Sequence, residues 1–581
     1  MTSIIKHDIH SHMLHLFEDF RAFLKGTKEN VPFWDIVVLT TADEEQKIAY
    51  ELQLQDKRMK KGLPESLQFH IFADKPAIKS GNGGATINSL GALYEIYGER
   101  VYEMKILMIH AGGKSQRLPS ASALGKIFTA LPIGEKFTQM LDLKLAIFMP
   151  FVKKMSAGVF VTCADDIVPY SLDADDANWS FENEGFTVLA HPSVVELGTK
   201  HGVYVLKDVD KLNEDKAVEM VECLRVLQKP GVESMRETNA IVRAPNSDVV
   251  YTDSAFFFDR KIARDFVEFY KTKGPVECEI DAYGDFLQAL GPNSNRAYIE
   301  NVSNVTRSHD NLRRTRDALY DLLEGTAINV VLLKNSKFYH IGTMKEYIEN
   351  FTGNDQFAAD IDLNRDNFNA YTGTRTNCSG CIIHSCLTGD SVIAESSVVE
   401  FCHFNSPVTV DANTILSNCE VTNNDVNRIH IPGQCFMHTL PVISNNRVHY
   451  VTIVLEIGTD LKTKINLNDP SCILYLGRSL FDWREDFGEI FPEGSAGYSS
   501  LWEARLFPVR PTMTESFLLA LSIWINFRDG RRDELRLEGV PRLSLADVLC
   551  GKDVKSMLSY RRELYEKISS LRCENDQIHV A

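Results

Sequence analysis

Residues 106–126, ILMIHAGGKSQRLPSASALGK, combine two adjacent glycines with two cations at a spacing suited to binding phosphate. A short apolar run predicts a buried strand, and Gly112 and Gly113 follow it directly. Glycine allows the backbone to approach a ligand closely, and successive N–H groups in such a turn bind anions. Arg117 then adds a planar guanidinium and Lys126 a point charge. The segment predicts a phosphate-binding site, although its spacing is neither GxxxxGK[ST] nor GxGxxG.

A second glycine-rich segment, GNGGAT, contains Gly81, Gly83 and Gly84 and precedes an apolar pattern typical of a helix. A glycine loop that opens a helix is suited to bind anions or nucleotides, because the first N–H groups of a helix have no partner within it. By itself, the segment fits a flexible turn equally well.

Two carboxylates, Asp165 and Asp166, end a hydrophobic run that begins at Gly158 and predicts another strand. Ligands of α/β sheets bind at the carboxyl ends of parallel strands, and Mg²⁺ prefers oxygen ligands. We therefore expect a divalent cation here. A helix-capping role fits Asp166 better than Asp165.

The elements that position these residues predict an α/β fold. Strand patterns followed by helical patterns indicate βα units of a mixed, mostly parallel sheet. Farther on, apolar residues recur every six positions, which favours a parallel β-helix. They are Cys386, Val392, Val398, Phe404, Val410 and Leu416. We predict an N-terminal helix in 1–30, the main α/β domain in 31–370, the β-helix in 375–440 and a β-rich, then helical, region in 441–581.

Length, charge and cysteine content restrict the class of protein. A chain of 581 residues predicts two or three domains, and a net charge of −17 argues against broad binding of nucleic acid or anionic membranes. No apolar run is long enough to span a bilayer, and the N-terminus lacks a signal-peptide pattern, so we expect a cytoplasmic protein. The twelve cysteines fit buried thiols better than disulfides or zinc, although Cys378, Cys381 and Cys386 approach a zinc-like spacing.

The motifs together resemble those of sugar-1-phosphate nucleotidyltransferases, in the form found in the fucose-1-phosphate guanylyltransferase family. The resemblance is most specific at 106–126, and WDIVVLTTAD, GNGGAT, CADD, YHIGT and LWEARLFP support it, from about Trp34 to Pro508. It implies a Rossmann-like domain followed by a left-handed β-helix. It also implies that GTP and L-fucose 1-phosphate condense to GDP-L-fucose and pyrophosphate, with Mg²⁺ as the cofactor.

The resemblance also assigns roles to individual residues. It implies catalytic roles for Arg117, Lys126 and Asp165. Nucleotide-binding residues are expected in both glycine segments, at Gly81, Gly83, Gly84, Ala111, Gly112, Gly113, Lys114 and Ser115. Substrate-binding residues are expected at Lys229, Asp253, Glu279 and Asp281. Asp285 fits a solvated helix face at least as well as a sugar contact.

Two positions depart from the family pattern, and one of them, Gln228, replaces the usual glutamate before Lys229. Many relatives read D-x-G-T where this chain has His340, and there the Asp is a second metal ligand. We expect Asp165 and His340 to form the metal site, but His340 fits a metal ligand, a phosphate contact and a structural role about equally, because hard cations prefer oxygen. Two other functions stay open: the same reaction with another nucleotide or sugar, and a non-catalytic regulatory subunit. A homo-oligomer is possible.

Overall fold

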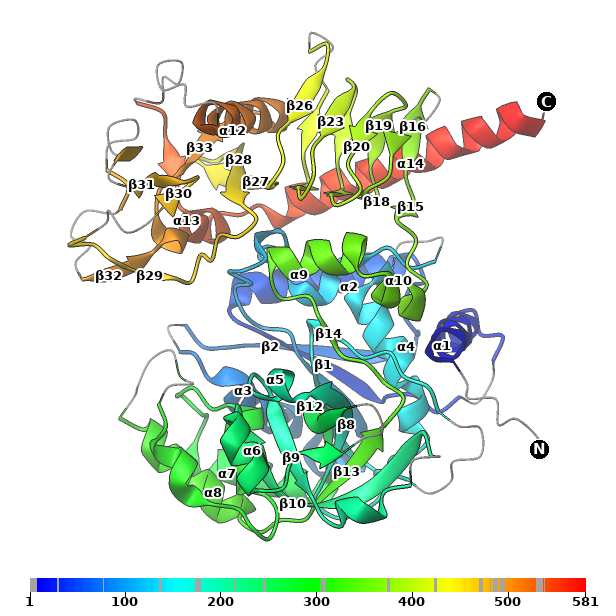
Figure 1. The fold of residues 1–581 in the computed structure, drawn as a ribbon, viewed down its shortest axis with the longest axis vertical. Coiled ribbons are helices and arrows are strands. Elements are labelled where there is room, and N and C mark those ends of the chain that lie inside the picture. Colours follow the sequence, from blue (N-terminus) through cyan, green and yellow to red (C-terminus); the bar gives the residue numbers. More distant parts are fainter. Residues whose placement is uncertain are drawn as a thin grey trace. The chain divides into compact units, whose positions relative to one another are not determined.

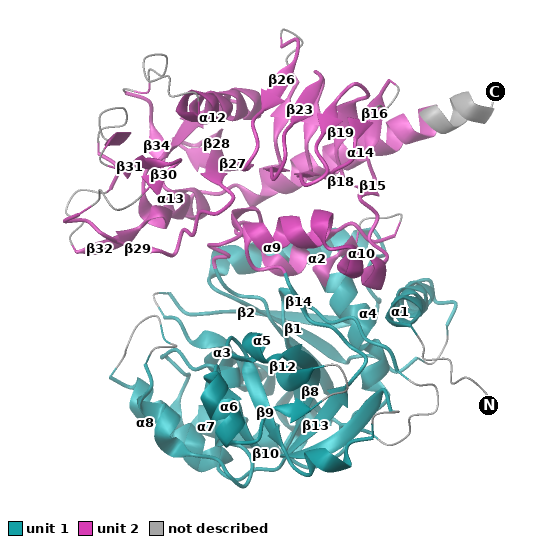
Figure 2. Ribbon diagram, in the orientation of Figure 1, with its two compact units in different colours: residues 1–113, 141–340 teal, residues 114–140, 341–581 magenta. Residues whose placement is uncertain are grey.

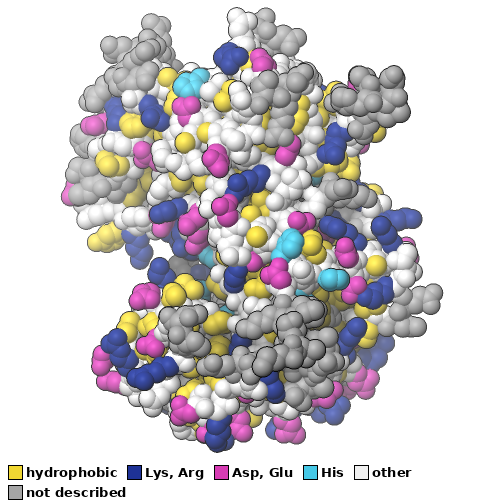
Figure 3. All heavy atoms as spheres, turned by 45° about the vertical axis from the view of Figure 1, so that its right-hand side comes forward, with side chains coloured by type: hydrophobic (Ala, Val, Ile, Leu, Met, Phe, Trp, Pro, Cys, Tyr) yellow, Lys and Arg dark blue, Asp and Glu magenta, His cyan; other side chains and the backbone are white. Residues whose placement is uncertain are grey.

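The computed structural model contains two compact units, residues 1–113 with 141–340 and residues 114–140 with 341–581 (Figure 2). On the face drawn in Figure 3, acidic and basic side chains are interspersed. The structure describes residues 8–28, 31–76, 78–134, 138–172, 179–213, 216–243, 247–302, 305, 310–373, 377–422, 426–469, 474–480, 482–483, 489–491, 497–528, 537 and 539–580. No helix among these residues is long and apolar enough to cross a membrane.

The first unit is built around one large mixed sheet (Figure 1). Its strand order is β2-β1-β3-β6-β12-β8-β13-β10-β9, with β11 paired to β12. The strands are β1 (Ile36–Thr41), β2 (Gln68–Ala73), β3 (Lys105–His110), β6 (Gly158–Cys163), β8 (Phe186–Val194), β9 (Gly202–Leu206), β10 (Val218–Gln228), β11 (Val242–Arg243), β12 (Asp248–Asp259) and β13 (Ile328–Leu333). The first four strands in the order pair in parallel, as does β8 with β13, and the other pairings are antiparallel. The sheet is therefore mixed, as predicted, but "mostly parallel" describes only its β2-β1-β3-β6 half.

Helices cover both faces of this sheet, so its central strands are mostly apolar, although β12 also contains Thr252, Asp253 and Ser254. On one face, Ile36 and Met108 belong to a core shared with α3, α7 and α8. On the other face, the ring of Phe160 in β6 lies 4.9 Å from that of Phe148 in α4. The helices of this unit are α1 (Ile9–Leu24), α2 (Glu44–Met59), α3 (Gly81–Tyr97), α4 (Met140–Val152, from Leu141 on), α5 (Val195–Gly198), α6 (Val232–Glu237), α7 (Arg260–Lys273) and α8 (Leu312–Leu323). Strands buried on both faces lack the alternating pattern of a half-exposed strand, which explains the continuous apolar runs in the sequence.

The second unit contains three sheets of short parallel strands. They include β15 (Asp366–Asn367), β18 (Cys381–Ile383), β21 (Val398–Glu400) and β24 (Ile415–Ser417); β16 (Ala370–Thr372), β19 (Cys386–Thr388), β22 (His403–Phe404) and β25 (Glu420–Val421); and β17 (Asn377–Cys378), β20 (Val392–Ile393), β23 (Val408–Val410) and β26 (Ile429–Ile431). The predicted six-residue series passes through these sheets in turn, from Cys386 in β19 to Leu416 in β24. Each turn of the chain through this region thus supplies one strand to each of the three sheets.

The period of these strands is slightly shorter than predicted. Three six-residue steps would place Phe404 beside Cys386, but His403 pairs with Cys386 and Glu420 with His403, at intervals of 17 residues. The strands also begin at Asp366, before the predicted start at 375. At these positions one turn of the coil is therefore one residue shorter than the sequence pattern suggests.

The rest of the second unit adds helices and a long hairpin. The hairpin, β27 (Cys435–Ser444) and β28 (Arg447–Glu456), continues the sheet of β24. Helix α14 (Val554–Val580) contacts β16, β19 and β27. The remaining elements are α9 (Met344–Ile348), α10 (Asp355–Ile361), α12 (Met513–Arg528), α13 (Leu545–Cys550), β4 (Ala130–Leu131), β5 (Thr138–Gln139), β29 (Lys464–Asn466), β30 (Leu474–Tyr475), β31 (Arg478–Ser479), β32 (Tyr498–Ser500), β33 (Phe507–Arg510) and β34 (Arg542–Leu543).

Candidate functional site

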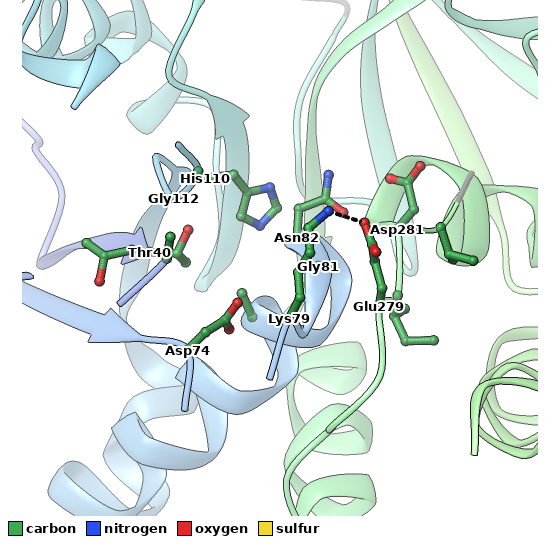
Figure 4. A pocket seen from close by; sticks show the side chains of 15 residues that line it. Thr40, Asp74, Lys79, Gly81, Asn82, His110, Gly112, Glu279 and Asp281 are labelled. Atoms are coloured by element: carbon green, nitrogen blue, oxygen red, sulfur yellow. Dashed lines mark hydrogen bonds and ion pairs between the residues drawn. The ribbon is translucent and has the colours of Figure 1, made fainter. Parts of the chain in front are cut away.

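A cavity of about 300 Å³ lies in the first unit, where β1 and β3 end and α3 begins (Figure 4). This volume is within the range of small-molecule sites. Its wall contains predicted nucleotide-binding residues (Gly81, Gly112 and Gly113) together with predicted substrate-binding residues (Glu279 and Asp281). The structure thus brings together residues separated by about 200 positions in the chain.

The glycines at the start of α3 allow this helix to pack against the segment 279–282. The N–H of Gly83 donates to the carbonyl of Ile280 at 2.9 Å, so it is not available to an anion. A side chain at Gly81 would place its Cβ 2.3 Å from the same carbonyl oxygen. Gly83 and Gly84 are not among the residues that line the cavity. Of the three predicted glycines, Gly81 lines the cavity, and the predicted role of Gly83 and Gly84 in nucleotide binding stays a prediction.

We expect Gly81→Ala to destabilise the first unit. The residue has φ +71°, and the added Cβ would contact the backbone of Ile280. Left-handed strain and a backbone clash together should cost about 2–4 kcal/mol of unfolding free energy, measured by urea denaturation. Gly231→Ala is the control, because its Cβ would meet nothing within 4 Å. Equal stability of the two variants would contradict this packing.

The cavity residues that were not singled out from the sequence include Thr40, Asp74, Lys79 and His110. Thr40 and His110 lie at the carboxyl ends of β1 and β3, and this position was the signal that could have identified them. Lys79 forms an ion pair with Glu279 at the cavity wall (Figure 4). Asp74 accepts a hydrogen bond from the hydroxyl of Ser80, just before α3.

His110 is a neutral polar group of the cavity. Burial lowers its pKa to about 3, so the imidazole carries no charge at neutral pH. Its Nε2 lies 2.8 Å from Oγ1 of Thr86 in α3. His110 can therefore hydrogen-bond a ligand without adding a positive charge.

Asp165 and His340 lie together although 175 positions separate them. Strand β7 (Asp166–Ile167) pairs with β14 (Tyr339–His340), and His340 Nε2 lies 3.2 Å from Asp165 Oδ2. Both side chains keep solvent access, with 24% of Asp165 and 32% of His340 exposed. Asp166 is not a helix cap, because it lies in β7 and pairs at 2.6 Å with the buried Lys144. Of the two adjacent carboxylates, Asp165 is the one accessible to a ligand.

The donor set fits a magnesium ion bound largely by substrate oxygens. Mg²⁺ sites commonly use one or two carboxylates together with substrate phosphates and water. Asp165 offers such a carboxylate, whereas the contact of His340 Nε2 with that carboxylate favours an orienting role for the imidazole. No group of three potential metal-ligating side chains occurs within the described ranges. Cys378, Cys381 and Cys386 lie in three different sheets.

Asp253 lies in β12, and Lys229 directly follows β10; strand β9 pairs with both of these strands. Asp253 in β12 accepts a hydrogen bond from the N–H of Gly202 at 3.0 Å. Burial raises the Asp253 pKa to about 7, and the Lys229 cation opposes part of that rise. The charge of Asp281, which lines the cavity, contributes to the rise as well.

The raised pKa predicts a pH effect on stability. Unfolded Asp has a pKa of about 3.9, so between roughly pH 4 and pH 7 the folded protein binds more protons at Asp253 than the unfolded chain does. Stability should therefore fall as the pH rises through this window. Asp253→Asn should make this fall in unfolding free energy smaller. The expected reduction is about 1.4 kcal/mol for each unit by which the pKa of Asp253 in the folded protein exceeds its pKa in the unfolded chain. Urea denaturation of the wild type and of Asp253→Asn across this pH range tests it, and an unchanged fall in the variant would contradict the prediction.

Asp285 is buried rather than solvated, which corrects the sequence interpretation. Its carboxylate lies 3.0 Å from Nε of Arg316, and the two side chains are 1% and 0% exposed. The charge pattern of a single helical segment predicts a solvated face, and it cannot show that Asp285 pairs with Arg316 on another helix.

The remaining predicted residues divide between the units. The backbone carbonyl of Ala111 accepts a hydrogen bond from the buried Tyr50 hydroxyl at 2.7 Å in the first unit. Lys114, Ser115, Arg117 and Lys126 belong to the second unit. The carbonyl of Arg117 accepts from the N–H of Met344, and Lys126 begins a short 3-10 helix, Lys126–Phe128. Their predicted ligand contacts stay predictions.

The eleven described cysteines are free thiols. Cys472 lies outside the described residues. Burial raises the pKa of several of these thiols, among them Cys381 and Cys435. Seven of the eleven are buried, as expected, whereas Cys550 and Cys573 are exposed.

Comparison with known proteins gives matches over most of the chain. The fucose pyrophosphorylase domain model matches residues 98–512. The fucose-1-phosphate guanylyltransferase of Mus musculus is 39% identical over 94% of this chain and 95% of its own, and that of Homo sapiens is 39% identical over 96% and 94%. The bifunctional fucokinase/GDP-fucose pyrophosphorylase of Arabidopsis thaliana is 22% identical, over 87% of this chain and 50% of its own. The matching domain model includes residues 106–126, and the mouse and human relatives are 39% identical over most of the chain. The chain therefore belongs to the fucose pyrophosphorylase family.

Proposed function

We propose that this protein transfers GMP from GTP to L-fucose 1-phosphate, giving GDP-L-fucose and pyrophosphate. The observation that carries the proposal is 39% identity over almost the full length to two fucose-1-phosphate guanylyltransferases. The cavity supports it, because its wall combines the glycine turn after β3 with polar and acidic side chains suited to a nucleotide. The finer classification proposed is a Rossmann-like sugar-1-phosphate nucleotidyltransferase domain followed by a left-handed β-helix. We also propose a cytoplasmic location.

The proposed chemistry needs positive charge and positioning rather than a protein nucleophile. A sugar phosphate has a second pKa of about 6, so its own oxygen attacks the α-phosphorus of GTP at neutral pH without a general base. The new bond joins that oxygen to the α-phosphorus, and the bond to the departing pyrophosphate breaks. The main barrier is to bring two anions together and to stabilise charge on the α-phosphate and on pyrophosphate.

In this proposal, different residues of the chain bind different parts of the substrates and the cation. The glycine turn at Gly112 and Gly113, with Arg117 and Lys126, holds the triphosphate, and Lys229 holds the sugar phosphate. Asp165, oriented by His340, holds the divalent cation, which when bound neutralises phosphate charge.

Substrate choice is tested by pyrophosphate release from each of GTP, ATP, UTP and CTP, with Mg²⁺ and a panel of sugar 1-phosphates. Release confined to GTP with L-fucose 1-phosphate supports the proposal. Turnover of another pair would keep the reaction and replace the substrate. No release by folded protein would favour a regulatory subunit.

A further inference from the structure

Segment 279–281 forms one wall of the cavity, and a buried ion pair lies behind it. Glu279, Ile280 and Asp281 line the cavity. The chain then forms a short π-helical turn, Ala282–Phe286, which contains Asp285. The Arg316 that meets Asp285 comes from α8 and is not among the cavity-lining residues.

Asp285 contacts a residue of this cavity wall directly. Its Oδ2 accepts a hydrogen bond from the N–H of Asp281 at 2.8 Å, while its Oδ1 faces Arg316. Its backbone carbonyl accepts from the hydroxyl of Tyr298 at 2.9 Å. Asp281 in turn caps the π-helical turn by accepting from the N–H of Tyr283. One carboxylate therefore joins α8 to the backbone of a cavity residue.

Arg316 is held as firmly as Asp285. Its Nη1 donates to the carbonyls of Ile299 and Asn301, at 3.2 and 2.7 Å, and its side chain is fully buried. A buried ion pair is seldom a net source of stability, because both charges lose their hydration. Apolar residues of similar size would fill this space without that cost, so stability alone does not explain the pair. Fixed direction of the Asp285 carboxylate does explain it.

We infer that Arg316 and Asp285 are positioning residues that fix the 279–281 wall of the cavity for the nucleotide. The inference rests on the proposed function insofar as the nucleotide is GTP. Without the pair, the N–H of Asp281 loses its acceptor and the wall is free to shift. The ground-state fit of the nucleotide should suffer, whereas the residues proposed for phosphate transfer are untouched.

The test compares Arg316→Met with Arg316→Met/Asp285→Leu and with the control Arg313→Met. Arg313 lies on the same helix, is 69% exposed and pairs at the surface with Glu300. We expect both Arg316 variants to weaken direct GTP binding about tenfold, and to raise the KM for GTP by a similar factor with little change in kcat. The double variant should have a higher melting temperature than the single one, because no unpaired charge stays buried. Arg313→Met should resemble the wild type in all these measurements.

A double variant that regains both stability and GTP affinity would overturn the inference, because the pair would then be only structural. So would a folded Arg316→Met that binds GTP normally. If both Arg316 variants fail to fold, Tyr298→Phe is decisive. It removes one hydrogen bond to Asp285, and we expect GTP binding to weaken about threefold; unchanged binding would overturn the inference.

Direct binding by equilibrium dialysis, without sugar phosphate, separates this test from that of the proposed function. Wild-type protein that binds GTP but does not use L-fucose 1-phosphate would refute the proposed reaction and leave the binding comparison intact. Wild-type protein that binds no nucleoside triphosphate would overturn both.

Discussion

Lys126→Ala is expected to lower kcat/KM by about a thousandfold, because the lysine is proposed to stabilise charge that develops on the triphosphate. The same change should alter the free energy of unfolding by less than about 1 kcal/mol, since the residue is only half-buried and begins a short 3-10 helix. Pyrophosphate release under steady-state conditions and urea denaturation measure the two effects on the same sample.

Lys153→Ala is the matched control for this lysine. Lys153 is exposed near the end of α4 and has no proposed role in binding. It should keep wild-type activity, which separates the local effect of Lys126 from a loss of net charge. Equal proportional losses of activity and stability in Lys126→Ala would contradict a role in catalysis.

Asp165→Asn should lower kcat by about 10²–10³-fold, because a neutral amide replaces the carboxylate proposed to hold the cation. Loss of the imidazole in His340→Ala should cost less, about 10–100-fold, as expected for a residue that orients a ligand. Titration of activity with Mg²⁺ should show a higher half-saturating concentration in both variants.

Asp208→Asn is the control for the carboxylate change. Asp208 is exposed and has a left-handed backbone that Asn also tolerates. Wild-type activity and Mg²⁺ dependence are expected. A His340→Ala loss larger than that of Asp165→Asn would reverse the two assigned roles, and His340 would then be the principal ligand.

Local patterns predicted the parts of the fold whose burial has a simple period. The run at 106–109 became part of β3, and the six-residue series identified strands of three successive sheets. The interval of 17 residues was missed because neighbouring positions such as His403 and Phe404 are both buried and fit the pattern almost equally well. A mixed sheet was predicted, but not how many of its strands are antiparallel, because the apolar content of a strand buried on both faces does not encode its direction.

Some of the site residues could likewise be predicted from the sequence, and others could not. Gly112 and Gly113 were found from the sequence because a strand end and a glycine turn are adjacent in the chain. Gly83 packs against a neighbouring backbone, and a glycine of this kind has the same sequence signature as one that admits a ligand. The contact of Asp285 with Arg316 joins two segments that no local pattern connects.

The proposed reaction is tested most directly with L-fucose 1-phosphate whose non-bridging phosphate oxygens are ¹⁸O, incubated with GTP and Mg²⁺. Attack by the sugar phosphate predicts GDP-L-fucose that retains all of the heavy oxygen and pyrophosphate that contains none, in equal amounts by mass spectrometry. Absence of GDP-L-fucose, or heavy oxygen in the released pyrophosphate, would contradict transfer of GMP to the sugar phosphate.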